Sequence, residues 1–181
     1  MRVFFGIELD QATALAIGDW RDRQFSHWAR PVPVANFHIT LAFAGELSDF
    51  DIDTLCLAVD EWVLGSQLPG AALELNQTGF WPAPGLYWLG PSQWPESLDT
   101  QASRLRHLVS SVGARRERKR FQPHITLFRR CDRSPPMPAQ PPAFTLDYRS
   151  IVLFESRQQR DGVSYHALRE WPLAAPGRKR P

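Results

Sequence analysis

The sequence predicts an α+β fold built from two similar lobes. Segments rich in β-forming residues alternate with segments whose apolar residues recur at helical spacing. The tetrapeptide His-Ile-Thr-Leu occurs twice, at residues 38–41 and again at residues 124–127. Each copy follows a helix-like segment and precedes further strand-like segments. The two halves of the chain therefore share one outline, which favours two similar lobes.

The first half is expected to begin with a strand and a helix. Asp10 can accept a hydrogen bond as the N-terminal cap of that helix, and Pro31 breaks the chain before the next strand. A second helix is expected to start at Asp51 or Asp53. The expected elements are a strand Arg2–Leu9, a helix through Trp20, a strand Phe37–Phe43, a helix through Trp62, and strands Ala72–Phe80 and Leu86–Leu89 joined by a turn at Pro82–Gly85.

The second half is expected to repeat this order. Pro95 is suited to open a helix, and Gly113 is suited to end it. A basic connector then leads to the second His-Ile-Thr strand, and the five prolines of residues 134–142 predict a loop. Two strands joined by a hairpin complete the half. The expected elements are a helix from Pro95 to Val112, a strand His124–Phe128, and strands Phe144–Glu155 and Val163–Arg169 that turn at Arg160–Gly162.

The composition is that of a soluble globular protein, with 181 residues of which 43% are hydrophobic and 22% are charged. No apolar run approaches the roughly 20 residues that a membrane helix needs, and the first ten residues lack the order of a signal peptide. Cys56 and Cys131 are too few for a disulfide framework. We therefore expect a cytoplasmic monomer without membrane contact, formed as one bilobal domain over residues 1–181 that ends in a flexible basic tail at 176–181.

The net charge of +2 is unevenly distributed along the chain. Residues 115–133 carry eight Arg or Lys against two acidic residues, which makes a local charge of +6. A basic surface beside the second motif suits a partner that carries phosphate groups. The connector at residues 115–120 could equally be a solvated loop that points away from the site.

The two motifs place an imidazole and a hydroxyl on one face of each strand. Side chains two residues apart share a face, so His38 projects with Thr40 and His124 projects with Thr126. If the lobes face each other, these groups line one cleft. Cleavage of a phosphodiester needs one group to take a proton from the nucleophile and another to protonate the leaving oxygen, on opposite sides of phosphorus. One His from each lobe would flank a phosphate in this way, so the pattern suits phosphodiester cleavage.

The two histidines could also be structural or bind a metal. A single His on an apolar strand is commonly structural, but the same tripeptide in two similar halves argues against that for both copies. A metal site is not indicated, because neither motif has a second His or a carboxylate at ligand spacing. Nucleotide-binding histidine-triad proteins need alternating histidines on one strand, which this chain lacks. We expect His27 and His107 on helix surfaces and His166 on a strand.

The motifs together resemble a known superfamily. The opening RVFFGIEL, then NFHITLAFAGEL, GFWPAPGLYWLG and QPHITLFR, are similar to the 2H phosphoesterases, and within them to the bacterial RNA 2′,3′-cyclic phosphodiesterases, also called 2′–5′ RNA ligase-like proteins. The resemblance covers nearly the whole chain. It implies pseudo-symmetric lobes, each a mainly antiparallel sheet with outer helices, that face each other across a cleft. Ala44 departs from the larger apolar residue that relatives often carry, and we expect a change in packing only.

The resemblance also implies a reaction and its residues. Water would open the 2′,3′-cyclic phosphate of an RNA end or nucleotide and leave a 2′-phosphate, with no metal or cofactor. The implied catalytic residues are His38 as general acid and His124 as general base, and the implied substrate-binding residues are Thr40, Thr126 and Arg129. With a 5′-hydroxyl in place of water, the same site would join RNA ends through a 2′–5′ linkage without ATP.

The sequence alone leaves alternatives open. A non-catalytic RNA-binding module could use the basic connector and exposed aromatic side chains. Trp81 and Trp88 could stack on bases, although aromatic residues on strands are more often in the core. A metal-dependent hydrolase would lose its activity to a chelator. Arg129 could be a surface charge, because strand alternation would place its neighbour Arg130 on the opposite face.

Overall fold

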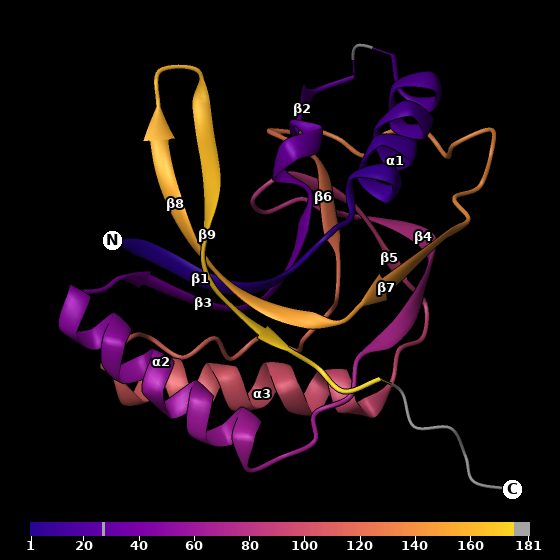
Figure 1. Ribbon diagram of the computed structural model, residues 1–181. Helices are drawn as coiled ribbons and strands as arrows, with labels where there is room; N and C mark the ends of the chain where they lie inside the picture. The colour runs from indigo at the N-terminus through magenta and orange to yellow at the C-terminus, as the bar shows by residue number, and fades with distance from the viewer. Residues whose placement is uncertain (27, 176–181) are drawn as a thin grey trace, which may run out of the picture.

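The computed structural model describes residues 1–26 and 28–175. Within these residues the chain forms three α-helices and two antiparallel sheets (Figure 1). The first sheet has the strand order β3-β1-β8-β9, and the second has the order β2-β6-β5-β4-β7. The expected α+β fold with two antiparallel sheets is confirmed. His27 and the expected basic tail at 176–181 lie outside the described residues.

The first sheet combines strands from both ends of the chain: β1 (Arg2–Glu8), β3 (His38–Glu46), β8 (Ser150–Gln159) and β9 (Gly162–Pro172). The second sheet comprises β2 (Arg30–Pro31), β4 (Ala71–Trp81), β5 (Leu86–Pro91), β6 (Ile125–Arg129) and β7 (Phe144–Tyr148). The helices are α1 (Gln11–Gln24), α2 (Asp49–Leu64) and α3 (Glu96–Ser111), with a short 3₁₀ turn η1 (Val34–Asn36).

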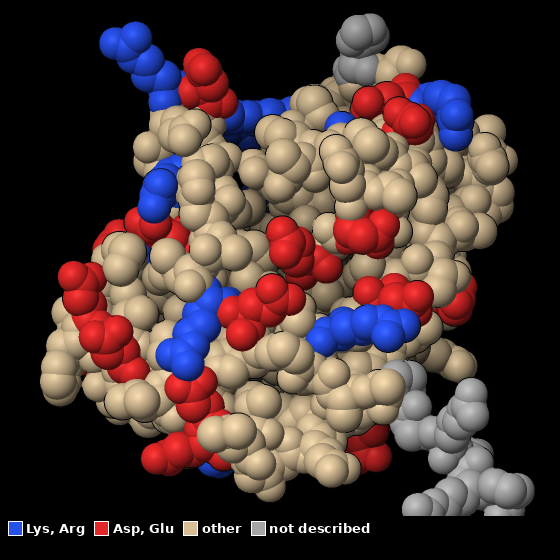
Figure 2. Space-filling view, viewed as in Figure 1, with Lys and Arg blue, Asp and Glu red and all other residues tan. Residues whose placement is uncertain are grey.

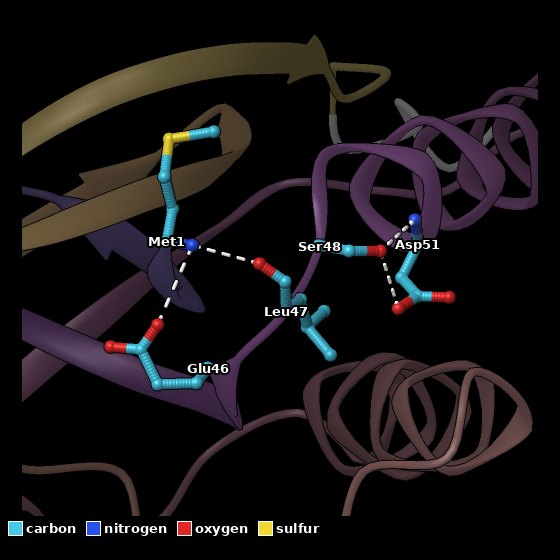
Figure 3. A network of polar contacts seen from close by, with 5 residues as sticks. All are labelled: Met1, Glu46, Leu47, Ser48 and Asp51. Carbon is cyan, nitrogen blue, oxygen red and sulfur yellow. Dashed lines mark hydrogen bonds and ion pairs between the residues drawn. The ribbon is translucent and has the colours of Figure 1, made fainter.

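The start of α2 lies earlier than the sequence suggested. Ser48, rather than an aspartate, is the N-terminal cap, and its hydroxyl accepts a hydrogen bond from the Asp51 amide at 3.1 Å. The preceding residues hold the chain terminus, because the amine of Met1 donates to the Leu47 carbonyl at 2.8 Å and lies 3.5 Å from the Glu46 carboxylate (Figure 3). This network fixes the junction between β3 and α2.

The expected strand Phe144–Glu155 is wrong as a single element. The chain leaves the second sheet after Tyr148 and enters the first sheet at Ser150, so β7 pairs with β4 while β8 pairs with β1. Residues 144–148 and 151–154 are both rich in β-forming residues, which is why the composition did not reveal the change of sheet. The two-residue strand β2 was also missed. It pairs with β6 at the edge of the second sheet, where a proline is tolerated.

Behind the two motif strands, one buried arginine joins elements from different parts of the chain. Arg21, on α1, is 4% exposed, and its guanidinium donates to the carbonyls of Val32 and Leu127. It also lies over the rings of Phe37 and Phe128, at 5.2 and 5.6 Å from their centroids. Arg21 therefore fastens α1 to the segment that leads into β3 and to β6.

Candidate active site

The two His-Ile-Thr motifs lie on different sheets. His38 is the first residue of β3 in the first sheet, and His124 directly precedes β6 in the second. The strands β3 and β6 contact each other although they belong to different sheets. The imidazoles are near enough that the charge of His124 lowers the pKa of His38. The fold therefore brings the two predicted histidines together.

The imidazole of His38 is fixed through both of its nitrogens. Nδ1 lies 2.7 Å from the Asn36 carbonyl, and because that oxygen can only accept, Nδ1 carries the proton. Nε2 then has its lone pair free to accept, and it lies 2.9 Å from the hydroxyl of Thr40. The expected pairing of His38 with Thr40 on one strand face is present.

The imidazole of His124 is held in the same way on one side only. Its Nδ1 lies 2.8 Å from the Gln122 carbonyl, so Nδ1 again carries the proton and Nε2 has a lone pair available. Among the hydrogen bonds of the described residues, none joins Nε2 of His124 to the hydroxyl of Thr126. The two motifs therefore share the tautomer but not the hydroxyl contact.

Aromatic rings flank each imidazole. The centroids of Phe4 and Tyr165 both lie 4.9 Å from that of His38, and Trp81 meets His124 edge-on at 4.6 Å. Trp88 lies 6.2 Å from His124 and is buried, so it belongs to the packing around the site. A Cβ at position 79 would collide with the Trp88 ring, which explains the glycine there.

Burial sets the charge state of the two histidines. Burial, with the nearby charges of Arg129 and His124, lowers the pKa of His38 to about 4. Burial, with a smaller effect of Arg129, also lowers the pKa of His124. Both imidazoles are therefore neutral near pH 7, and each presents an unprotonated Nε2 that can accept a proton.

A cavity of about 880 Å³ opens between the β8–β9 hairpin and the β2–η1 segment. His38, Thr40 and Arg129 line it, whereas His124 and Thr126 are not among its lining residues. Figure 2 shows blue Lys or Arg atoms in the hollow between the hairpin and the α1 side of the molecule. The cavity is lined by more basic than acidic side chains. The basic ones are Arg2, Arg30, Arg129 and Arg130, and the acidic ones are Glu46 and Asp161.

Comparison with known proteins identifies the family. The family model described as LigT like Phosphoesterase matches residues 89–165. The RNA 2′,3′-cyclic phosphodiesterase of Escherichia coli K12 is 34% identical over 175 residues, which cover 95% of this chain and 96% of that protein. This chain belongs to the LigT-like phosphoesterase family. The resemblance inferred from the sequence is confirmed.

Other LigT-like phosphoesterases agree with this assignment. The RNA 2′,3′-cyclic phosphodiesterase of Thermus thermophilus is 30% identical over 186 residues, covering 96% of this chain and 90% of that protein. The crystal structure of E. coli LigT complexed with 3′-AMP superposes with a TM-score of 0.85 at 33% identity, over 95% of this chain and 97% of that one. The two-sheet architecture is therefore shared with solved members of the family.

Arg130 does not lie where strand alternation placed it. Arg130 directly follows the last residue of β6, Arg129, and its φ of 56° lies in the left-handed region of the backbone map. The alternation of faces therefore stops at Arg129, and both arginines line the cavity. The expectation that they occupy opposite faces was wrong.

The basic connector folds away from the cavity of this LigT-like phosphoesterase. Its residues 115–120 are exposed and do not line the cavity beside His38. The guanidinium of Arg106, on α3, donates to the Lys119 carbonyl at 2.7 Å and holds the connector against that helix. Arg116, Arg118 and Lys119 line a second cavity of about 500 Å³ beside α3. The geometry favours the solvated-loop interpretation.

The other described histidines lie on the elements that the sequence suggested. His107 is exposed on α3, and His166 lies on β9 with Nε2 at 3.0 Å from the Ser164 hydroxyl. The described part of the chain contains no group of three His, Cys, Asp or Glu side chains arranged to hold a metal ion. Residues 1–26 and 28–175 also contain no helix long and apolar enough to cross a membrane.

Asn36 and Tyr165 line the site but were not predicted from the sequence. The signal for Asn36 was present, since an amide residue stands two positions before each histidine, in Asn-Phe-His and Gln-Pro-His. Tyr165 could not have been found from local sequence, because it approaches His38 from β9 at the other end of the chain.

Proposed function

We propose that this LigT-like phosphoesterase hydrolyses the 2′,3′-cyclic phosphate of RNA ends or nucleotides to a 2′-phosphate, with His38 and His124 as acid and base and without a metal. The observation that carries the proposal is the matched pair of imidazoles from two sheets. In each, Nδ1 is occupied by a backbone carbonyl while Nε2 can exchange a proton. The names of the E. coli and T. thermophilus relatives support the substrate class.

The proposed reaction divides the proton transfers between the lobes. The 3′ oxygen must leave to give a 2′-phosphate, so water attacks phosphorus on the opposite side. Nε2 of His124 takes a proton from this water. His38 protonates the 3′ oxygen, and because it is neutral in the free protein it must first gain a proton. The negative charge of the bound phosphate favours this step, since a nearby anion raises the pKa of an imidazole.

Three further side chains are proposed to bind the phosphate. The hydroxyls of Thr40 and Thr126 donate to its non-bridging oxygens, where negative charge grows in the transition state. Arg129 lines the cavity, and its planar guanidinium can donate two parallel hydrogen bonds to a phosphate. The Thr40 hydroxyl must turn from His38 to the phosphate when substrate binds, since it contacts Nε2 in the free protein.

A single assay tests the reaction class. The purified protein is incubated with a 2′,3′-cyclic nucleotide in the presence of EDTA, and the position of the product phosphate is identified by ³¹P NMR. We expect a 2′-phosphate at a rate that EDTA does not change. A 3′-phosphate would contradict the proposed geometry of attack, and loss of turnover with EDTA would favour a metal-dependent hydrolase. A complete lack of turnover would favour the non-catalytic RNA-binding alternative.

One chain supplies both motifs, so we propose that a cytoplasmic monomer, folded as one bilobal domain over residues 1–181, is the active form. Light scattering during gel filtration tests this, because a stable dimer would contradict it. The same site would accept a 5′-hydroxyl in place of water as the nucleophile, with the 3′ oxygen leaving as before. RNA fragments with a cyclic phosphate end and a 5′-hydroxyl end should be joined through a 2′–5′ linkage without ATP when both are held in excess.

A further inference from the structure

The tip of the β8–β9 hairpin extends beyond its sheet. The strand β1 pairs with β8 only from Val152 to Glu155, whereas β8 and β9 continue to pair with each other up to the contact of Gln159 with Gly162. We call residues 156–165 the arm, and Figure 1 shows it standing away from the rest of the molecule. A two-stranded ribbon without a third strand is only marginally stable in water. The position of the arm must therefore depend on contacts with other elements.

The arm forms one wall of the cavity beside His38. Six residues of the arm line this cavity: Ser156, Gln158, Asp161, Gly162, Val163 and Tyr165. At the base of the arm, the ring of Tyr165 packs edge-on against His38, with 4.9 Å between centroids. At its tip, a Cβ on Gly162 would lie 3.6 Å from the guanidinium of Arg30. The arm thus contacts the imidazole at its base and lies close to Arg30 on the opposite side of the cleft at its tip.

One side-chain hydrogen bond joins the arm to the opposite side of the cleft. The amide nitrogen of Asn36 donates to the carbonyl of Val163 at 2.7 Å. Among the side-chain hydrogen bonds of the described residues, it is the one that joins the arm to an element outside β8 and β9. The 3₁₀ turn η1 fixes the backbone of Asn36, because the backbone N–H of this residue donates to the Pro33 carbonyl at 2.8 Å. The donor is therefore presented from a defined turn.

The same residue also holds the imidazole. The carbonyl of Asn36 accepts the proton on Nδ1 of His38. Gln122 occupies the equivalent position in the second motif and accepts from His124 in the same way, yet its side-chain amide donates to the adjacent Pro123 carbonyl, at 3.2 Å. Within the described residues, Asn36 therefore contacts both His38 and the arm that walls the cavity, whereas Gln122 contacts His124 but not the arm.

We propose that Asn36 is a positioning residue that couples closure of the arm over the cleft to the orientation and burial of His38. With the Asn36–Val163 bond formed, Tyr165 covers one side of the imidazole and excludes water from it. Without that bond, the arm separates from η1, water reaches His38, and Nε2 is no longer held toward the substrate. The inference deepens the proposed function, on which its kinetic part rests.

Three variants test the coupling. Asn36→Ala removes the side-chain amide but keeps the backbone carbonyl. Asn36→Gln keeps a side-chain amide, placed one methylene further from the backbone. Gln122→Ala is the matched control in the second motif. Hydrogen–deuterium exchange of residues 156–165 and the NMR titration of His38 are measured without substrate. These two readouts remain informative even if the protein hydrolyses no cyclic phosphate, so failure of the proposed function can be told apart from failure of the coupling.

In Asn36→Ala we expect faster exchange in the arm and a His38 pKa that moves up toward the ordinary value, because burial is the main cause of its depression. The groups that face His38 and also act on its titration, Arg129 and His124, are unchanged in every variant. Turnover should fall by about ten- to a hundredfold with little change in KM, the size expected when a catalytic group is misplaced. Asn36→Gln should restore part of the loss, and Gln122→Ala should leave exchange in the arm and the His38 titration unchanged.

Two outcomes would overturn the proposal. If exchange in the arm is unchanged in Asn36→Ala, the bond to Val163 does not hold the arm. If the arm opens but the His38 titration and kcat stay at wild-type values, Asn36 holds the arm without coupling it to the imidazole. If Asn36→Ala does not fold, Asn36→Gln decides in the same way, through partial changes in the same three measurements.

Discussion

The first and second His-Ile-Thr motifs have nearly the same sequence but different surroundings. In both imidazoles Nδ1–H donates a hydrogen bond to the backbone carbonyl two residues earlier. His38 also contacts the Thr40 hydroxyl and lines the cavity, whereas His124 is not among the residues that line that cavity. His38 packs against Phe4 and Tyr165 of its own sheet, and His124 packs against Trp81 and Trp88 of the other.

The difference shows how a repeated motif can serve two roles. The hydrogen bond from Nδ1 to the backbone carbonyl selects the tautomer of each histidine. The same spacing of two residues allows this bond at both motifs. The side chains that approach each imidazole come from other strands and are not repeated, so they can set a different pKa and different access to solvent. Similar motifs therefore need not act alike, and variants made in pairs can separate their roles.

The largest effect is expected from removing either imidazole. His38→Ala or His124→Ala should lower turnover of a 2′,3′-cyclic nucleotide by roughly 10² to 10⁴, the usual contribution of an acid–base group. The double variant should lose less than the product of the two, because the pair acts as one unit. Steady-state kinetics and circular dichroism check both activity and fold. Near-normal turnover in either folded variant would remove that histidine from the mechanism.

Both motifs should make the stability of the fold depend on pH, and His38 gives the effect a defined window. The pKa of His38 is about 4 in the folded chain against about 6.5 when unfolded, so the unfolded state binds the extra proton as pH falls through this window. The stability that neutral His38 contributes is present above pH 6.5 and is lost by about pH 4. The difference corresponds to about 3 kcal/mol.

Urea unfolding at several pH values measures this loss. The wild type should be destabilised between pH 6.5 and 4, and His38→Phe should show a clearly flatter profile over that window. His124→Phe should flatten the profile in the same direction, since burial also lowers the pKa of His124. A variant of the exposed His107 is the control. Identical profiles for the wild type and His38→Phe would contradict the depressed pKa.

A smaller effect is expected from the two hydroxyls. Thr40→Val and Thr126→Val keep the β-branched shape and remove the donor, and each should lose about 1 to 3 kcal/mol of transition-state stabilisation, measured through kcat/KM. Thr40→Val should change the NMR titration of its histidine more than Thr126→Val does, because Thr40 contacts Nε2 of His38 in the free protein. Equal titration shifts in both motifs would mean that the second hydroxyl also contacts its imidazole in solution.

The smallest effect is expected at the cavity rim. Arg129→Ala should lower kcat/KM by roughly tenfold, the low end of the range for a hydrogen bond to a charged group. Arg129→Lys should recover only part of this, since an ammonium cannot make the two parallel bonds of a guanidinium. Arg130→Ala is the neighbouring control, and it should have less effect. Unchanged kinetics in Arg129→Ala would make that residue a surface charge.

The sequence predicted much of this site because its signals are local. Strand alternation alone paired His38 with Thr40, and a repeated tripeptide pointed to two lobes. What it missed depends on distant parts of the chain. The change of sheet at Arg149 is set by which strand is available to pair, and the contact of Tyr165 with His38 is set by the hairpin. The left-handed backbone of Arg130 ended a strand where alternation would have continued.

The position of β1 has a consequence for how the chain is made. In the first sheet, β1 lies between β3 and β8, so one side of it stays unpaired until residues 152–155 have been synthesised. At typical translation rates this leaves an open strand edge for roughly 7 to 30 s. Unpaired edges invite association with other chains. Nascent copies truncated before β8 should therefore aggregate or bind chaperones, and the molecule cannot be divided at its midpoint into two lobes that fold alone.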